Sequence, residues 1–491
     1  MKTPPVESTA ATPKSSSFAG DVFKLVSGTT IAQGLMVLAS PFLARLYTPE
    51  DFGTLAIYLS ITSIVGVIAC LRYELAIMLP ESDEEAANLL AVSLGFSLIV
   101  TCLTTLAIGW GGETLLGWLN APGLKPYLWL IPVTVLLDGV FQALNYWNSR
   151  TKQFGRLSIA RVTSSAATVS TQLGAGYAGY ATGGSLIGAN VVGKTISTAV
   201  LGEQIWRDDR ATFWKAIRWQ GMARGGRRYK KFPMISTWST LLNTTSSQLP
   251  ALLLSVFFSS SVVGFYSLGH RILSMPMSLI GAAIGQVFFQ RAAIAKKEGT
   301  ISLLVDITFR RLLMIGLFPM LLLTVIGKDF CIVVFGLNWS EAGVYIQIMS
   351  LWIFMQFISA PLASLINIFE KLEVAFFIQL FLLATRFLSL FLGGVFDSVY
   401  LTLLLFTASG VIIYGYLFIW ILIISGNSFT RYIVLIGNNS LYFLPLGLLL
   451  VIMKLYKFES RDVLLVSLAI VLLYYIYSFD FLNYSFNKTR T

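Results

Sequence analysis

The sequence predicts an all-α polytopic membrane protein: two six-helix bundles around a central cavity, with two further transmembrane helices at the carboxyl end. Three observations support this prediction. The 491 residues are 56% hydrophobic and only 12% charged, whereas a soluble protein has about twice that charged share. The apolar residues form about fourteen runs near the ~20 residues that a membrane-spanning helix needs. The two halves of the chain also resemble each other.

The expected spans fall into two sets of six and a final pair. The first set lies at about 22–45, 50–73, 86–110, 124–148, 154–178 and 182–206. The second set lies at about 232–257, 262–290, 302–326, 340–367, 373–396 and 398–425. The final pair lies at about 430–453 and 462–483.

A shift of 211 residues aligns the two halves. Gly53 then falls on Gly264, and the first span falls on the seventh. Because each half has an even number of spans, both halves have the same orientation in the membrane. We therefore expect two parallel pseudo-repeats, related by an axis along the membrane normal, with a site between them.

The distribution of basic residues predicts the orientation. Nine Lys or Arg lie between Arg207 and Lys231, and further basic groups follow the fourth and eighth spans. These loops share one side, which the positive-inside rule makes cytoplasmic, and both termini are then cytoplasmic too. Three cations near the end of the chain depart from this pattern: Lys454, Lys457 and Arg461.

The predicted domain organisation follows from these runs. A disordered cytoplasmic tail (1–20) rich in Ser, Thr and Pro precedes the amino-terminal lobe (21–206). A basic cytoplasmic linker (207–231) leads to the carboxyl-terminal lobe (232–425), and residues 426–491 hold the two extra helices and a short tail. The linker is either an amphipathic helix on anionic headgroups or simply a basic connection that obeys the topology rule.

Several classes of function are disfavoured by what the sequence contains. A single histidine excludes a multi-histidine metal centre, and the three cysteines lie in apolar runs without metal-ligand spacing. No phosphate-binding loop or nucleotide fingerprint is present, so transport powered directly by ATP is not expected. We expect no metal or other cofactor and no catalytic residues, and no nucleic-acid partner, because no soluble domain carries a basic surface.

The stretch from Val262 to Arg291 suggests where the site lies. It is apolar enough to cross a bilayer, yet it contains His270 and Arg271 within the span. A charge in the hydrocarbon core costs at least ~2.5–3.5 kcal/mol, so Arg271 should face protein or water. Arg271 shares a helix face with small or polar residues, and Pro276 predicts a kink just beyond it. The face comprises Gly264, Ser267, Ser274, Ser278, Gly281 and Gly285.

Other spans carry polar stripes of the same kind. Cations outnumber acids in them, which predicts a cavity suited to an anionic group such as phosphate, pyrophosphate, an acidic sugar or a carboxylate. The candidate substrate-binding cations are Arg271, Lys194, Arg161 and Arg386. The candidate polar or ion-coupling residues are Asp138, His270, Gln142 and Gln172.

Simpler roles for these residues remain open. Arg161 and Arg386 lie near the cytoplasmic half of their helices and are long enough to reach the interface. Asp138 is either the partner of Arg161 in a structural ion pair or a cation or proton site. His270 is either packed in its neutral form or titrates. Small residues also serve as helix-packing contacts, although their recurrence beside charges on several helices favours a hydrated cavity.

Residues 51–90 resemble the amino-terminal signature of bacterial oligosaccharide flippases. Gly53, Tyr58 and the LRYELA block at Leu71–Ala76 carry the resemblance, and the stretch around Arg271 is similar to the second-half counterpart. These proteins are Wzx-type exporters of the multidrug/oligosaccharidyl-lipid/polysaccharide (MOP) superfamily. The resemblance covers about residues 20–425.

The resemblance implies both an activity and partners. It implies two lobes around a V-shaped, alternating-access cavity in the bacterial cytoplasmic (inner) membrane. The substrate would be an undecaprenyl-pyrophosphate-linked oligosaccharide, such as an O-antigen unit of lipopolysaccharide, moved from the cytoplasmic to the periplasmic leaflet. A polysaccharide polymerase and a chain-length protein would be partners. The last two helices would guide the lipid, as in the peptidoglycan-precursor flippases.

Two rival functions are weighed against the flippase. A multidrug/cation antiporter of the same superfamily should have an acidic cavity, whereas cations predominate here. A membrane glycosyltransferase or polysaccharide polymerase should have a large extramembrane loop with catalytic groups. The longest loop here is basic and predicted to be cytoplasmic, so the protein is not expected to be an enzyme.

Overall fold

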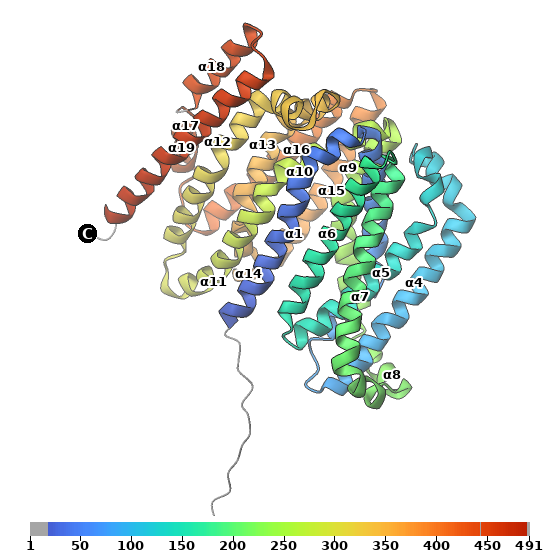
Figure 1. Ribbon diagram of the computed structural model, residues 1–491. Helices are drawn as coiled ribbons and strands as arrows, with labels where there is room; N and C mark the ends of the chain where they lie inside the picture. The colour runs from blue at the N-terminus through green and yellow to red at the C-terminus, as the bar shows by residue number, and fades with distance from the viewer. Residues whose placement is uncertain (1–17, 442, 489–491) are drawn as a thin grey trace, which may run out of the picture.

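The computed structural model describes residues 18–441 and 443–488, and within these ranges the regular secondary structure is entirely helical (Figure 1). Two lobes lie side by side. The amino-terminal lobe comprises α1 (Phe18–Leu46), α2 (Pro49–Ile68), the short α3 (Tyr73–Ala76), α4 (Asp83–Trp118), η1 (Pro122–Tyr127), α5 (Leu130–Arg150), α6 (Phe154–Tyr177) and α7 (Gly183–Ala216).

A linker helix, α8 (Trp219–Arg228), leads to the carboxyl-terminal lobe. That lobe comprises η2 (Phe232–Ser236), α9 (Thr237–Phe257), α10 (Ser260–Pro276), η3 (Met277–Gly281), α11 (Ala282–Glu298), α12 (Ile301–Phe335), η4 (Leu337–Trp339), α13 (Ser340–Ser359), η5 (Leu362–Ser364), α14 (Leu365–Ile368), α15 (Leu372–Val395) and α16 (Val399–Ile424). Three helices follow it: α17 (Phe429–Leu441), α18 (Leu444–Leu455) and α19 (Ser460–Lys488).

The apolar character of the helices confirms a multi-pass membrane protein. Among the described residues, seven helices are individually long and apolar enough to span a bilayer, and an eighth span arises if α17 and α18, bent by 45°, count as one. The other predicted spans are helical too. Those that fall short include α5, α6 and α7, whose polar faces are turned towards the protein interior. The polar faces of these three helices explain part of the difference from fourteen, and α10 and α11 have 17 residues each, too few for either to count as a span alone.

Local sequence signals set the helix starts, and they repeat between the lobes. Thr48 and Asp51 form a capping box that opens α2, with Pro49 in the first turn. The hydroxyl of Ser259 caps α10, and Ser259 is the residue on which Thr48 falls after the 211-residue shift. The preceding helices, α1 and α9, also end at positions related by that shift. The predicted internal repeat is confirmed here.

The repeat-related glycines form the tightest contact between the lobes. A Cβ on Gly53 would lie 1.7 Å from the carbonyl oxygen of Ser260, and a Cβ on Gly264 would lie 1.8 Å from that of Pro49. Pro49 and Ser260 are themselves related by the shift, so the contact is symmetric. Only glycine allows the first turns of α2 and α10 to cross with their backbones touching. Gly264, predicted to line a cavity, instead joins the lobes.

Trp339 seals the same end of the molecule. Its indole Nε1 donates to the carbonyl oxygen of Ala44 at 2.6 Å, and its ring packs edge-on against Phe52 at 5.0 Å. Asn120 donates to the carbonyl oxygen of Phe258 at 2.8 Å, again joining the lobes. Figure 1 places this end at the upper edge, opposite α8. We call it the closed end.

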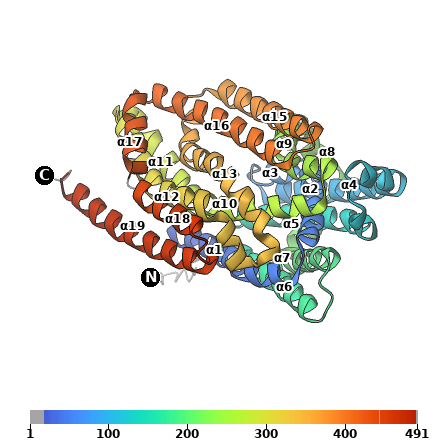
Figure 2. The ribbon, with the colours of Figure 1, turned by 90° about the horizontal axis from the view of Figure 1, so that it is seen from above.

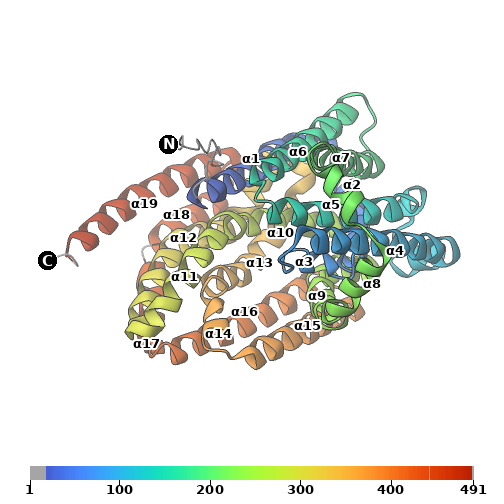
Figure 3. The ribbon, with the colours of Figure 1, turned by 90° about the horizontal axis from the view of Figure 1, so that it is seen from below.

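The last helices pack along the outer side of α12, as the views from above and below show (Figures 2 and 3). Phe318 stacks on Tyr474 with ring centroids 4.2 Å apart. Lys454 forms an ion pair with Asp329 at 2.8 Å, and Ser460 donates to the same carboxylate. The ninth span, expected to end near residue 326, is longer than predicted: α12 continues to Phe335, and Asp329 in this extension has a partner within the protein.

The tail and the linker differ from their predictions in detail. The tail predicted for residues 1–20 falls mostly outside the described residues, but Phe18 to Gly20 already belong to α1. The linker forms α8, which packs on α4 through two glycines. Gly221 lies against Asn88 and Gly225 against Leu89. Asn88 also fixes the turn before α8, because its amide bonds the carbonyl of Ala216 and the N–H of Arg218.

Candidate functional site

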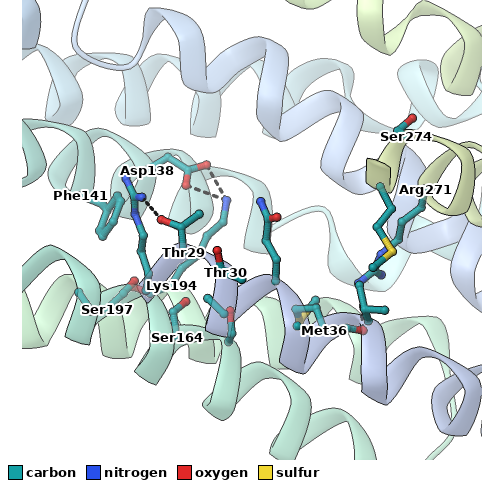
Figure 4. Close-up of a pocket in the computed structure, with 18 residues that line it drawn as sticks. Thr29, Thr30, Met36, Asp138, Phe141, Ser164, Lys194, Ser197, Arg271 and Ser274 are labelled. Atoms are coloured by element: carbon teal, nitrogen blue, oxygen red, sulfur yellow. Dashed lines mark hydrogen bonds and ion pairs between the residues drawn. The ribbon is translucent and has the colours of Figure 1, made fainter. Parts of the chain in front are cut away.

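A cavity of about 650 Å³ lies between the lobes, approximately midway along the helices. Four amino-terminal helices (α1, α5, α6 and α7) and α10 of the other lobe form its wall (Figure 4). Three of the predicted cations and the predicted carboxylate line it: Arg161, Lys194, Arg271 and Asp138. Four residues that are distant in the chain therefore share one chamber.

The carboxylate has one cationic partner. Asp138 on α5 lies 2.7 Å from Nζ of Lys194 on α7, and both side chains are about three-quarters buried. The alternative pairing of Asp138 with Arg161 is not observed. Lys194 is therefore neutralised by the protein itself, while the three cations and one carboxylate together leave the wall with a net positive charge.

The two arginines are held by uncharged groups. Arg161 on α6 donates from Nη1 to the hydroxyl of Thr29, and Arg271 on α10 donates from Nη2 to the carbonyl oxygen of Met36 at 3.2 Å. Among the described residues, no carboxylate lies within ion-pair distance of either guanidinium. Each lobe therefore contributes one arginine whose positive charge is not compensated locally.

Small residues allow the charged helices to approach one another. A Cβ on Gly193, beside Lys194, would lie 1.9 Å from Oγ1 of Thr168 on α6. Gly66 on α2 leaves room beside Asp138, since a Cβ there would be 3.6 Å from the carboxylate. The polar stripe of α6 adds Ser164 and Ser165 to the wall. Because small and polar side chains cover the faces of these helices that meet in the chamber, the charged residues there are kept away from the lipid.

Arg386 and His270 lie elsewhere, in the interior of the carboxyl-terminal lobe. His270 is stacked between Tyr266 and Trp352, with centroids 5.7 Å and 5.8 Å away. The guanidinium of Arg386 lies 5.9 Å from the Trp352 ring and donates to the backbone and hydroxyl of Ser246. Neither residue belongs to the wall of the cavity, although Arg271 follows His270 directly. Successive helical residues point about 100° apart, so only one of the two faces the chamber.

The two glutamines are also outside the cavity wall. Gln142, one turn beyond Asp138 on α5, donates to the carbonyl oxygen of Gly66 at 3.4 Å. Gln172 is buried near the other end of α6, where its backbone carbonyl oxygen accepts a hydrogen bond from the hydroxyl of Tyr47. Gln142 adjoins the charged group, whereas Gln172 has a packing role between α6 and α1.

Sequence reasoning missed the contribution of α1. Thr29, Thr30 and Gln33 line the cavity, and Thr29 holds Arg161. The signal was present, because Thr29 and Gln33 are one turn apart in an otherwise apolar span. Their lack of charge made them less conspicuous than the residues on α5 to α7.

Comparisons with known proteins agree with this architecture. Residues 42–344 match the family model described as "Polysaccharide biosynthesis protein". The teichuronic acid biosynthesis protein TuaB of Bacillus subtilis (strain 168) is 23% identical over 169 residues. That match covers 34% of this chain and 35% of TuaB, so it spans only about a third of the relative's length.

Two solved structures share the fold along most of the chain. One is the lipid II flippase MurJ in an inward closed conformation, with a TM-score of 0.73 and 13% identity over 94% of this chain and 100% of that one. The other is an inward-facing multidrug resistance MATE family transporter of the MOP superfamily, with a TM-score of 0.67 and 13% identity over 83% and 98% of the chains. The expected two-lobe architecture is confirmed.

Proposed function

Because the chain belongs to the family of polysaccharide biosynthesis proteins, we propose that it is a flippase for an undecaprenyl-pyrophosphate-linked oligosaccharide. The substrate moves from the cytoplasmic to the periplasmic leaflet of the bacterial inner membrane. An O-antigen unit or the repeat of another surface polysaccharide fits this role. Both termini are then cytoplasmic, and a polymerase with its chain-length protein takes over the product.

The pair of uncompensated arginines carries the proposal. Arg161 and Arg271 face one chamber from opposite lobes, and neither has a carboxylate partner among the described residues. A guanidinium is the side chain best suited to phosphate oxygens, since its donors form a planar fork. A pyrophosphate supplies the negative charge that the chamber lacks, while its lipid tail stays in the bilayer.

The lobe contacts support alternating access. The lobes are joined at the closed end through Gly53, Gly264 and Trp339. The basic linker lies at the opposite end, which the positive-inside rule assigns to the cytoplasm. In this arrangement the chamber receives substrate from the cytoplasmic leaflet. Release on the other side requires the contact between α2 and α10 to separate.

The experiment that tests the function is the sidedness of the lipid-linked oligosaccharide in a deletion strain. Sugars facing outward are oxidised by membrane-impermeant periodate in spheroplasts, and those facing inward only in inverted vesicles. We expect the intermediate to accumulate facing the cytoplasm without the protein. Unchanged sidedness with no accumulation would contradict the flippase function.

Asp138 favours one alternative, a multidrug/cation antiporter of the same superfamily. A carboxylate in the cavity is what a cationic drug requires, but here Lys194 occupies it at 2.7 Å. Sensitivity of the deletion strain to cationic drugs separates the two functions. Increased sensitivity with normal oligosaccharide sidedness would favour the antiporter.

A further inference from the structure

We infer that Asp138 is a counter-anion that a substrate phosphate must displace from Lys194, which makes the cavity selective for a diphosphate over a monophosphate. This inference rests on the proposed function and assigns a role to a carboxylate that an anion-binding chamber would otherwise not need.

The three cations of the chamber differ in whether a carboxylate accompanies them. Lys194 is paired with Asp138 at 2.7 Å, while Arg161 and Arg271 have, among the residues that the structure describes, only a hydroxyl and a backbone carbonyl as partners. Two of the three cations are thus available to a ligand at once. The third becomes available only if Asp138 gives it up.

Few contacts hold the Asp138 carboxylate in its position. Among the described residues, Lys194 supplies the only hydrogen bond to the Asp138 side chain. Backbone groups and a second cation do not fix its position. Gly66 leaves the α2 side of the carboxylate without a side chain, and Gln142 stands one turn away with a long hydrogen bond of 3.4 Å. The Asp138 side chain therefore has room to rotate away from Lys194 towards the amide group of Gln142, which is a hydrogen-bond donor.

Electrostatic competition for Lys194 distinguishes a monophosphate from a diphosphate. Asp138 and an incoming phosphate are both anions and compete for the ammonium group of Lys194. Asp138 and Lys194 are each about three-quarters buried, so like charges beside them repel more strongly than they do in solution. A ligand with one phosphate binds to an arginine without displacing Asp138 and gains little by approaching Lys194. A diphosphate has a second charged group that recovers the cost of displacing Asp138.

The residues facing Asp138 are consistent with this role. The charged groups around it in the chamber are Lys194 on α7, Arg161 on α6 and Arg271 on α10. On its own helix Phe141 is the neighbouring lining residue, and it offers no charge. Asp138 is therefore the single acidic group of this wall, and its removal changes anion binding through one side chain.

The test measures binding of inorganic pyrophosphate and inorganic phosphate to the purified full-length protein by calorimetry. Wild type should bind pyrophosphate about tenfold more tightly than phosphate, a ratio within the usual range of coupling between two sites. Asp138→Asn should raise the affinity for phosphate about tenfold and reduce the discrimination accordingly. Lys194→Gln should lower the affinity for pyrophosphate to about that for phosphate.

The double variant D138N/K194Q shows whether the effect passes through Lys194. We expect it to lose the gain seen in Asp138→Asn, and because it removes both charges it also serves as the control for folding. A gain that persists in the double variant overturns the inference, and so does an Asp138→Asn protein with wild-type affinities.

The outcomes also separate this inference from the proposed function. If pyrophosphate binds and Arg161→Gln weakens it, but Asp138→Asn changes nothing, the role of Asp138 fails and the anionic cavity stands. If no variant and no wild-type protein binds pyrophosphate, the anionic cavity itself fails, together with the role of Asp138.

Discussion

At the scale of single residues, the chemistry of the cavity depends on which charges are paired. The sequence placed Arg161, Lys194, Arg271 and Asp138 in the membrane but did not reveal that Lys194 is the partner of Asp138. That pairing joins α5 to α7 over 56 positions of the chain. It depends on how the helices rotate when they pack, which helical spacing within one span does not specify.

Replacement of Arg161 separates charge from geometry. Arg161→Ala should reduce transport about tenfold or more, because a hydrogen bond to a charged group contributes ~1.5–3 kcal/mol. Arg161→Lys keeps the charge and loses the planar fork. Oligosaccharide export in complemented cells measures both variants. Full restoration by lysine would assign Arg161 a purely electrostatic role, and equal activity of the alanine variant would remove it from the mechanism.

His270 provides the opposite prediction. Its ring is stacked between Tyr266 and Trp352 and does not line the cavity. His270→Phe keeps an aromatic ring in that position, and volume-conserving substitutions in a packed core cost little stability, so export should stay within about twofold of wild type. A large loss of export in this variant, with normal expression, would show that the imidazole nitrogens act in transport.

At the scale of helices, α2 and α10 show most clearly that the internal repeat was predictable from the sequence. The shift of 211 residues aligned Gly53 with Gly264, and the structure brings these two glycines together. Their contact with each other was not predicted, because sequence similarity shows that two segments are equivalent without showing that they touch. The sequence likewise did not show which residues of the polar face around Arg271 meet the other lobe. Gly264 joins the lobes, whereas Arg271 and Ser274 line the cavity.

A side chain at either glycine should loosen the closed end. Gly53→Ala and Gly264→Ala should each destabilise the protein by ~1–3 kcal/mol or more, since a Cβ would overlap a backbone carbonyl that has little room to move. The melting temperature in detergent measures the effect. Gly95→Ala is the matched control, because nothing lies within 4 Å of a Cβ at that position. Equal melting temperatures for all three variants would contradict the contact.

The last helices explain an exception to the charge pattern. Lys454 lies away from the basic end, but its ammonium is paired with Asp329 and also donates to the carbonyl of Val325. A paired lysine says little about topology, and its partner lies 125 positions earlier in the chain. For this reason neither the exception nor the extension of α12 to Phe335 was predictable from local composition.

Breaking this pair should weaken the attachment of α18 and α19 to α12. Lys454→Met leaves Asp329, which is 8% exposed, without its cation. The expected loss is ~1–3 kcal/mol, below the range for a fully buried pair because Lys454 is partly exposed. Thermal unfolding measures it. The double variant K454M/D329N should recover most of the loss, and failure to recover would show that the lysine acts through packing alone.

At the scale of the whole molecule, composition and apolar periodicity were sufficient to predict two helical lobes with a chamber between them. The chamber joins one arginine from each lobe, and the repeat-related glycines, Trp339 and Asn120 hold the lobes together at the closed end. A change in lobe angle at that end would therefore move Arg271 away from Met36 and relative to Arg161, which stays with Thr29 in the other lobe. This coupling of charge to lobe position is what the flippase account requires.

The central claim is that a cationic chamber moves the pyrophosphate across the membrane, and Arg271 tests it most directly. The measurement is the sidedness of the lipid-linked oligosaccharide in cells whose only copy of the protein carries Arg271→Ala. The account predicts normal protein levels with the intermediate facing the cytoplasm. An intermediate that reaches the outer leaflet at the wild-type rate in these cells would contradict it.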